Sequence, residues 1–361
     1  MKYGKIRIED GFLVFTRHMM INSLPCRDIV WAYMRKEGAD EGGDRQLSIN
    51  YLVIVTRRKK RYKFDMSQRE VQDCIRLLRA LNPDMATGFP KGGRVLLQSL
   101  SDTRDLGAIV TEDGRHILPK RLLRSGALYH ISQADKELLM EAYNLKAVID
   151  LRSGAEIRKK PDLIMAGVEY YHIPILEEVS GLCDTGDIRE LLQKIPADPW
   201  EYVRNFYAQI GTDLYAIKQF ARFVDVVYHH EKGALLWHSD TGRGRAGLAT
   251  ALLLALLGVK KDIIYQDYLR TNRYLSPELK YMLRLSQTWP EAGADTEEKL
   301  TALYQVREDY LENISFTDVL FGFFHHVTVL FFREDRLDLC FQLQSREGFF
   351  FPFADQLRHV F

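Results

Sequence analysis

The residues best suited to chemistry lie in one stretch, residues 234–247, which read ALLWHSDTGRGRAG. The apolar run ending at Trp237 predicts a buried strand, and the apolar residues 248–257 predict a core helix, with glycines allowing a tight turn between them. The amides of such a loop and the dipole of the helix that follows favour an anion. Arg245 has the planar guanidinium that can hold two oxygens of a phosphate group. The stretch therefore predicts a phosphate-binding loop made by Asp240, Thr241, Gly242, Arg243, Gly244 and Arg245.

The spacing from His238 to Arg245 resembles the His-Cys-(x)5-Arg loop of cysteine-dependent phosphatases. In that family a thiolate attacks phosphorus, loop amides and the arginine bind the phosphoryl oxygens, and an aspartate protonates the leaving group. This chain has Ser239 at the cysteine position. A helix N-terminus lowers the pKa of a thiol enough to make a nucleophile, whereas a serine hydroxyl gains too little. The resemblance places Ser239 and Arg245 at catalytic positions, and we expect the chain to bind phosphate but hydrolyse it poorly.

Other segments resemble one branch, the bacterial and fungal tyrosine and lipid phosphatases, whose loop usually reads His-Cys-x-Ala-Gly-Lys-Asp-Arg-Thr-Gly. The matches follow the order of the family from about residue 100 to residue 272: TRDLG (103–107), LRSG (123–126), VIDLRS (148–153), LGV (257–259) and DYLRTN (267–272). The departures gather in the loop, where Arg243 replaces Lys, Gly244 replaces Asp and Ala246 replaces Thr. Gly244 matters because the aspartate of that loop is implicated in the acid chemistry of the branch.

Four residues outside the loop are candidates for supporting roles. Asp150 ends a predicted strand and matches the Asp-Leu-Arg-Ser aspartate, which makes it a candidate general acid; the alternative is a buried carboxylate that orders Arg152. In the family the histidine equivalent to His238 orients the loop through hydrogen bonds. Arg104 and Asp105 are expected to pair with each other and to brace the loop from behind, with substrate contact as the alternative.

The N-terminal residues 1–82 predict a small β-rich module. Short strands are expected over 2–8, 12–15, 29–34, 47–56 and 62–64, and the Asp-Gly pair before residue 12 is a hairpin signal. A helix over 67–81 is expected, because Ser67 and Glu70 have the spacing of a capping box. This order of elements resembles a pleckstrin-homology-like barrel.

Residues 83–95 are rich in Pro and Gly and predict a linker to a second domain, 96–312. Strand and helix signals alternate there, which predicts an α/β layered domain on a mainly parallel sheet. The tail 313–361 is rich in Phe and has lost the periodicity of the preceding helices. It is either an extra packing element or partner surface, or a segment translated out of its ancestral frame, which we favour.

Composition limits the classes of function. The formal net charge of +1 argues against binding nucleic acid by bulk positive charge. The four cysteines show no metal-ligand spacing, so we expect neither a metal nor another cofactor, and we expect a cytoplasmic chain. No apolar run is long enough to span a bilayer. The basic run Arg57, Arg58, Lys59, Lys60 and Arg61 is either a contact for anionic lipid or a solvated turn.

The sequence therefore predicts a phosphatase of the cysteine-dependent tyrosine phosphatase type that is poorly active as written. Asp240 beside the loop would repel additional phosphates, which favours a singly phosphorylated substrate such as phosphotyrosine. A pseudophosphatase that binds phosphoprotein or phosphoinositide without catalysis is the alternative, because Ser239, Gly244 and Ala246 all depart from the family pattern. A P-loop nucleotidase is disfavoured, since its Gly-x-x-x-x-Gly-Lys-Ser/Thr motif is absent.

Overall fold

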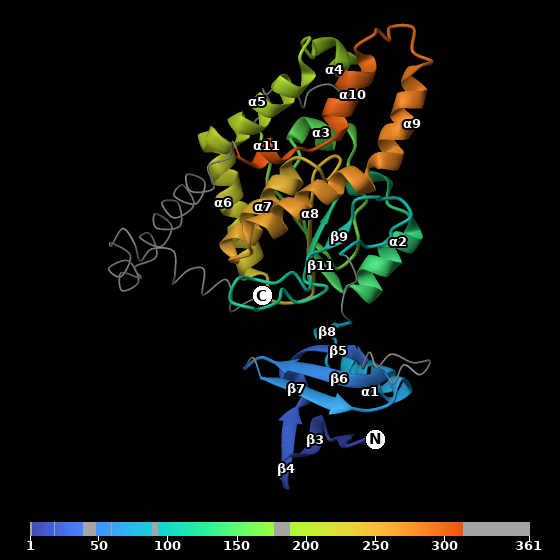
Figure 1. Cartoon of the computed structure of the whole chain (residues 1–361), viewed down its shortest axis with the longest axis vertical. Coiled ribbons are helices and arrows are strands. Elements are labelled where there is room, and N and C mark those ends of the chain that lie inside the picture. Colours follow the sequence, from blue (N-terminus) through green and yellow to red (C-terminus); the bar gives the residue numbers. More distant parts are fainter. Residues whose placement is uncertain are drawn as a thin grey trace, which may run out of the picture. The chain divides into compact units, whose positions relative to one another are not determined.

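The computed structural model describes residues 2–17, 19–38, 48–58, 60–88, 93–176 and 188–312. The chain divides into two compact units (Figure 1). The first contains residues 1–93 together with 105–108 and 117–122, and the second contains the remaining described residues. The Phe-rich tail 313–361 and Lys59 of the basic run lie outside the described residues.

The first unit consists of short strands and one long helix. Its elements are β1 (Lys2–Tyr3), β2 (Ile6–Glu9), β3 (Phe12–Arg17), β4 (Met20–Pro25), a 3-10 turn (Cys26–Asp28), β5 (Ile29–Gly38), β6 (Ser48–Thr56), β7 (Arg61–Asp65), α1 (Gln68–Leu81) and β8 (Ala86–Thr87). They form two four-stranded sheets, ordered β1-β2-β3-β4 and β7-β6-β5-β8. Strand β4 was not expected from the sequence, and β8 takes residues assigned to the linker and pairs them with β5.

Helix α1 begins where the capping signal places it. The Ser67 hydroxyl accepts a hydrogen bond from the Glu70 amide, and the Glu70 carboxylate accepts one from the Ser67 amide. These bonds satisfy amides that the first turn leaves unpaired. Val71, Cys74 and Leu78 share one face and lie in the core with residues of both sheets. The capping prediction is confirmed, while the likeness to a pleckstrin-homology barrel stays a prediction.

The second unit is an α/β domain, as predicted. Its elements are β9 (Arg104–Asp105), β10 (Leu122–Ser125), a 3-10 turn (Leu128–His130), α2 (Gln133–Glu137) continued by a π-helical turn (Leu138–Ala142), β11 (Leu145–Asp150), α3 (Gly154–Lys159), β12 (Glu169–His172), α4 (Ile188–Lys194), α5 (Pro199–Thr212), α6 (Leu214–His229), β13 (Ala234–His238), α7 (Arg245–Leu256), α8 (Lys261–Tyr274), α9 (Ser276–Ser286), α10 (Thr296–Tyr304) and α11 (Glu308–Glu312). The strands form one sheet in the order β12-β11-β13-β10-β9.

Two neighbouring parallel strands place candidate site residues at the same edge of this sheet. Strand β11 pairs in parallel with both β12 and β13, and Asp150 lies opposite His238 at the carboxyl ends. All five residues of β13 are buried, because the strand is central and covered on both faces. Helix α7 follows and is buried over almost its whole length, packed against β13, α6 and α8. The loop therefore connects two buried elements, β13 and α7.

Candidate functional site

The loop between β13 and α7 holds the residue at the nucleophile position. Ser239 follows the last residue of β13 and is only 2% exposed, whereas Asp240 is exposed at the rim. Gly244 is the N-cap of α7 and has no side chain to cap it, so amides of the first turn are left for another acceptor. The sequence prediction of a strand, a glycine-bearing loop and a helix N-terminus is confirmed. This geometry suits an anion.

Neighbouring main chain holds the loop in its bent path. Gly242 has a φ of +74°, and a Cβ built there would lie 2.5 Å from the carbonyl oxygen of Ser125. The Gly242 carbonyl accepts a hydrogen bond of 2.6 Å from Arg124 Nη2, and the Asp240 carbonyl accepts one of 3.0 Å from the Ala127 amide. These carbonyls are therefore tied down on the β10 side of the loop. Arg124 of the LRSG segment 123–126 and Ala127 directly after it supply this support.

The guanidinium of Arg245 is held by a partner that the sequence reasoning missed. Arg245 Nη1 and Nη2 each donate a 2.6 Å hydrogen bond to a different carboxylate oxygen of Glu156 on α3. Burial disfavours ionisation of Glu156, but the charge and hydrogen bonds of Arg245 outweigh it and lower the carboxyl pKa. Glu156 also closes a capping box with Ser153. The spacing Ser-x-x-Glu was a readable signal for that helix start, although not for the ion pair.

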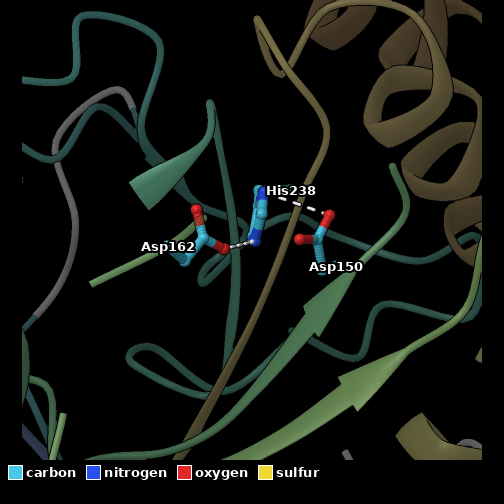
Figure 2. A group of neighbouring side chains, drawn as sticks. All are labelled: Asp150, Asp162 and His238. Carbon is cyan, nitrogen blue, oxygen red and sulfur yellow. Dashed lines mark ion pairs between the residues drawn. The ribbon is translucent and has the colours of Figure 1, made fainter. Parts of the chain in front are cut away.

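Asp150, Asp162 and His238 form a buried cluster beside the loop (Figure 2). Arg152 grips Asp150 through hydrogen bonds from its main-chain amide, Nε and Nη2, the last at 2.7 Å. Burial alone would raise the pKa of Asp150, but the charges of His238 and Arg152 and the hydrogen bonds from Arg152 lower it. A carboxyl that is both ionised and fully engaged is poorly suited to donate a proton. These contacts favour the second interpretation of Asp150, the ordering of Arg152.

The side chains of this cluster are close enough together to ligate a metal ion, but a positively charged arginine already pairs with both carboxylates. Ligand atoms of Asp150, Asp162 and His238 lie within 4.8 Å of one another. However, Arg152 Nη2 lies 2.7 Å from Asp150 and 2.9 Å from Asp162, so one guanidinium already bridges the two carboxylates. A divalent cation would have to displace a buried arginine, at a large desolvation cost. The arrangement is better described as an ion-pair cluster.

The predicted pairing of Arg104 with Asp105 is wrong. Arg104 pairs instead with Asp102 at 3.1 Å and with Asp267 of α8 at 3.3 Å. The Asp105 carboxylate turns the other way and accepts hydrogen bonds from the amides of Gly107 and Lys120. The side chains of adjacent residues in a strand point to opposite faces of the sheet. Arg104 and Asp105 therefore point away from each other.

Arg104 nevertheless belongs to a network behind the loop. Arg124, which holds the Gly242 carbonyl, shares the carboxylates of Asp102 and Asp267 with Arg104. The two arginines and two aspartates are buried and balance in formal charge. Breaking one partner of such a buried set typically costs about 3–5 kcal/mol. Among the described residues, Arg104 is thus linked to the loop only through the carboxylates that it shares with Arg124, a residue to which the sequence assigned no role, and bracing of the loop by Arg104 stays a prediction.

Two further loop residues, Arg243 and Gly244, lie next to tyrosines of the helices. The Arg243 guanidinium lies over the ring of Tyr304 at 5.5 Å, and its Nε and Nη1 are buried without a hydrogen-bond partner among the described residues. A Cβ at Gly244 would lie 3.0 Å from the hydroxyl of Tyr207. A side chain at 244 would therefore need that hydroxyl to move by a few tenths of an ångström. Phosphate contact by Arg243 stays a prediction.

The basic run of the first unit is exposed where it is described. Arg57, Arg58 and Lys60 lie between β6 and β7, and Arg61 is the first residue of β7. Exposure suits both a solvated turn and a lipid contact, so the lipid contact stays a prediction. Among the described helices, none has the length and apolar character needed to cross a membrane.

The second unit is similar in sequence to known phosphatases. The family model described as the tyrosine phosphatase family matches residues 95–318. A Cupriavidus necator protein named as a putative tyrosine-protein phosphatase is 31% identical over 178 residues, which are 48% of this chain and 62% of that protein. The triple specificity protein phosphatase PtpB of Mycobacterium tuberculosis is 26% identical over 182 residues, 45% of this chain and 65% of that protein. Each alignment covers less than two-thirds of the relative's own length.

Among solved structures, the core catalytic domain of the PP-IP phosphatase SIW14 from S. cerevisiae aligns with 59% of this chain and 97% of that chain. Its sequence identity is 14% and the TM-score is 0.26. Values this low add nothing to what the sequence matches give.

Proposed function

Because this chain belongs to the tyrosine phosphatase family, we propose that its second unit binds phosphate monoesters in the loop between β13 and α7. The observation that carries the proposal is the placement of Arg245, which Glu156 holds at the N-terminus of α7, in the same loop as the buried Ser239. Amides of residues 240–245 and the Arg245 guanidinium would take the phosphoryl oxygens. In such sites the largest contribution to catalysis usually comes from hydrogen-bond donors that already point at the place where negative charge develops in the transition state.

Hydrolysis in the chain as written is limited by residue 239. In-line attack needs a nucleophile at that position, and a thiolate would be stabilised there by the helix N-terminus. Within the described part of the chain, no histidine or carboxylate hydrogen-bonds the Ser239 hydroxyl and could act as its base. We therefore infer weak or absent turnover together with intact phosphate binding. The non-catalytic binding module remains the second candidate, and Ser239 is the observation that favours it.

Neither of the two positions considered for the general acid, 244 and 150, holds a carboxyl that is free to donate a proton. Gly244 has replaced the loop aspartate of the branch, and the Asp150 carboxylate is engaged by Arg152 with a lowered pKa. We propose that Asp150 orders Arg152 beside the loop. A leaving group that needs no proton, such as a nitrophenolate, would then be the best probe of the site.

The substrate we propose is a singly phosphorylated protein side chain, with phosphotyrosine first. Relatives of the chain are named as protein phosphatases. Exposed Asp240 at the rim would repel a second phosphate by like charge, which disfavours polyphosphorylated lipids. Contact of the basic turn Arg57–Arg61 with anionic lipid would be a separate property of the first unit.

One substitution separates the enzyme from the binding module. Ser239→Cys is expected to hydrolyse p-nitrophenyl phosphate, while the chain as written and Ser239→Ala stay nearly inert. Equal rates for all three would remove residue 239 from the reaction. If Ser239→Cys binds phosphate but does not turn over, the binding module is the better description.

A further inference from the structure

Asp162 is the hub of the buried cluster in Figure 2, although no sequence signal pointed to it. Its Oδ1 accepts a 2.9 Å hydrogen bond from the Leu128 amide and lies 2.9 Å from Arg152 Nη2. Its Oδ2 lies 2.9 Å from Nε2 of His238. One carboxylate therefore joins the segment after β10, the segment after β11 and the last residue of β13.

His238 needs this partner because its side chain is fully buried. The imidazole is 0% exposed, and its other nitrogen, Nδ1, lies 3.8 Å from Asp150, beyond hydrogen-bond distance. A buried polar ring without a close partner pays most of its desolvation penalty. Neither ring nitrogen has an aligned hydrogen-bond partner among the described residues, and the carboxylate of Asp162, at 2.9 Å from Nε2, lies closer to the ring than that of Asp150. The main-chain carbonyl of His238 is fixed by a 2.9 Å hydrogen bond from the Leu151 amide.

Asp162 reaches the loop from a second side. Leu128, which donates to Asp162, follows Ala127, and the Ala127 amide donates a 3.0 Å hydrogen bond to the carbonyl of Asp240. The residues on both sides of Ser239 are therefore linked to the same carboxylate, His238 by direct contact and Asp240 through Ala127 and Leu128. Displacing Asp162 would loosen residue 238 and residue 240 together.

We propose that Asp162 is a positioning residue for the phosphate loop, acting through His238 and the Ala127–Leu128 peptide to fix residue 239 and the first loop amides. The inference rests on the proposed function of the loop. A positioning residue differs from a purely structural ion-pair partner in one respect. The orientation of the loop amides should depend on Asp162, and so should the affinity for anions and the ionisation of a thiol introduced at position 239. The pairing of Asp162 with Arg152 alone would affect stability only.

The first test measures binding of inorganic phosphate to the chain as written, by calorimetry. Asp162→Asn keeps the size of the side chain and removes its charge, and we expect the dissociation constant to rise at least tenfold in a folded variant. The matched control is Asp225→Asn on α6, since Asp225 pairs with His229 at 3.2 Å but at an exposed site. Phosphate affinity should not change there. Equal affinities for all three folded proteins would overturn the proposal.

The second test does not require hydrolysis or phosphate binding. In the Ser239→Cys background, alkylation by iodoacetamide is followed by mass spectrometry as a function of pH. Loop amides that no longer point toward residue 239 would stabilise the thiolate less. Asp162→Asn should therefore raise the apparent pKa of the thiol by about one unit, which is a tenfold change in the ratio of thiolate to thiol. Loss of a nearby negative charge alone would lower it. An unchanged or lowered midpoint would therefore overturn the proposal.

A double-mutant cycle with His238→Gln isolates the pathway. If Asp162 acts through His238, Asp162→Asn should change thiol ionisation little once His238→Gln is present; additive effects would contradict the proposal. Should Asp162→Asn fail to fold, Asp162→Glu keeps the charge and moves the oxygens by one methylene, and the midpoint should still rise. A parent chain that binds no phosphate would count against the proposed function, while the alkylation midpoints would still decide the role of Asp162.

Discussion

Gly242 offers the sharpest test of how the phosphate loop is built. The substitution Gly242→Ala places a Cβ at a φ of +74° and 2.5 Å from the carbonyl oxygen of Ser125. Gly114→Ala is a matched control, because Gly114 has a φ of +78° but no atom lies within 4 Å of the place where its Cβ would be. Both variants therefore carry the backbone cost, and only Gly242→Ala adds the collision with β10.

The two costs can be separated in magnitude. A left-handed conformation costs a residue with a Cβ roughly 1–2 kcal/mol, which both variants should lose. Forcing an extra methyl group against fixed main chain typically adds about 1–3 kcal/mol. The Ser125 carbonyl cannot swing away easily, since it ends β10 in the central sheet and Arg124 next to it is pinned in the buried network. For a domain of this size, the excess corresponds to a melting temperature lower by about 2–12 °C.

The assay is thermal unfolding by circular dichroism, paired with phosphate binding by calorimetry. Gly114→Ala should lose some stability and keep its phosphate affinity. Gly242→Ala should lose more stability and also bind phosphate at least tenfold more weakly, because the loop must move to release the collision. If Gly242→Ala unfolds at the same temperature as Gly114→Ala and binds phosphate as tightly as the parent, the steric argument is refuted.

Three further predictions test individual side chains. Arg245→Ala should weaken phosphate binding at least tenfold in calorimetry, since losing a desolvated charged partner costs on the order of 2–5 kcal/mol; unchanged affinity would remove Arg245 from the site. In the Ser239→Cys background, Asp150→Asn should slow an aryl phosphate with a poor leaving group and one with a good leaving group to the same degree, because Asp150 orders Arg152. A selective loss of roughly a hundredfold with the poor leaving group would restore it as the general acid. Burial raises the pKa of Asp105 to about 6, although hydrogen bonds from Gly107 and Lys120 oppose the shift. The folded state thus binds this proton more tightly than the unfolded state, and the resulting stability is present below about pH 4 and lost as the pH rises through about 6. Denaturant unfolding of Asp105→Asn should lack this loss, which amounts to about 3 kcal/mol at most, and identical pH dependence in both proteins would contradict the shift.

Much of the local structure could be read from the sequence, because its signals are local. The Ser67–Glu70 capping box placed the start of α1, and the apolar run before His238 with the glycines after it placed β13, the loop and α7. Alternation of strand and helix signals indicated the α/β class of the second unit. Strand β4 was missed, since Met20–Pro25 ends in a proline and shows no regular alternation.

The partners of the site residues were decided only by the tertiary structure. Arg245 and Glu156 are far apart in sequence and meet because β13 and β11 are neighbours in a parallel sheet, which brings the loop after one strand to the helix after the other. Asp162 reaches His238 for the same reason. Arg104 pairs with Asp102 and Asp267 and not with adjacent Asp105, because the side chains of adjacent strand residues point in opposite directions. The sequence alone determined which residues could do the chemistry; the fold determined which charge each of them faces, because ion pairing depends on distances that sheet order sets.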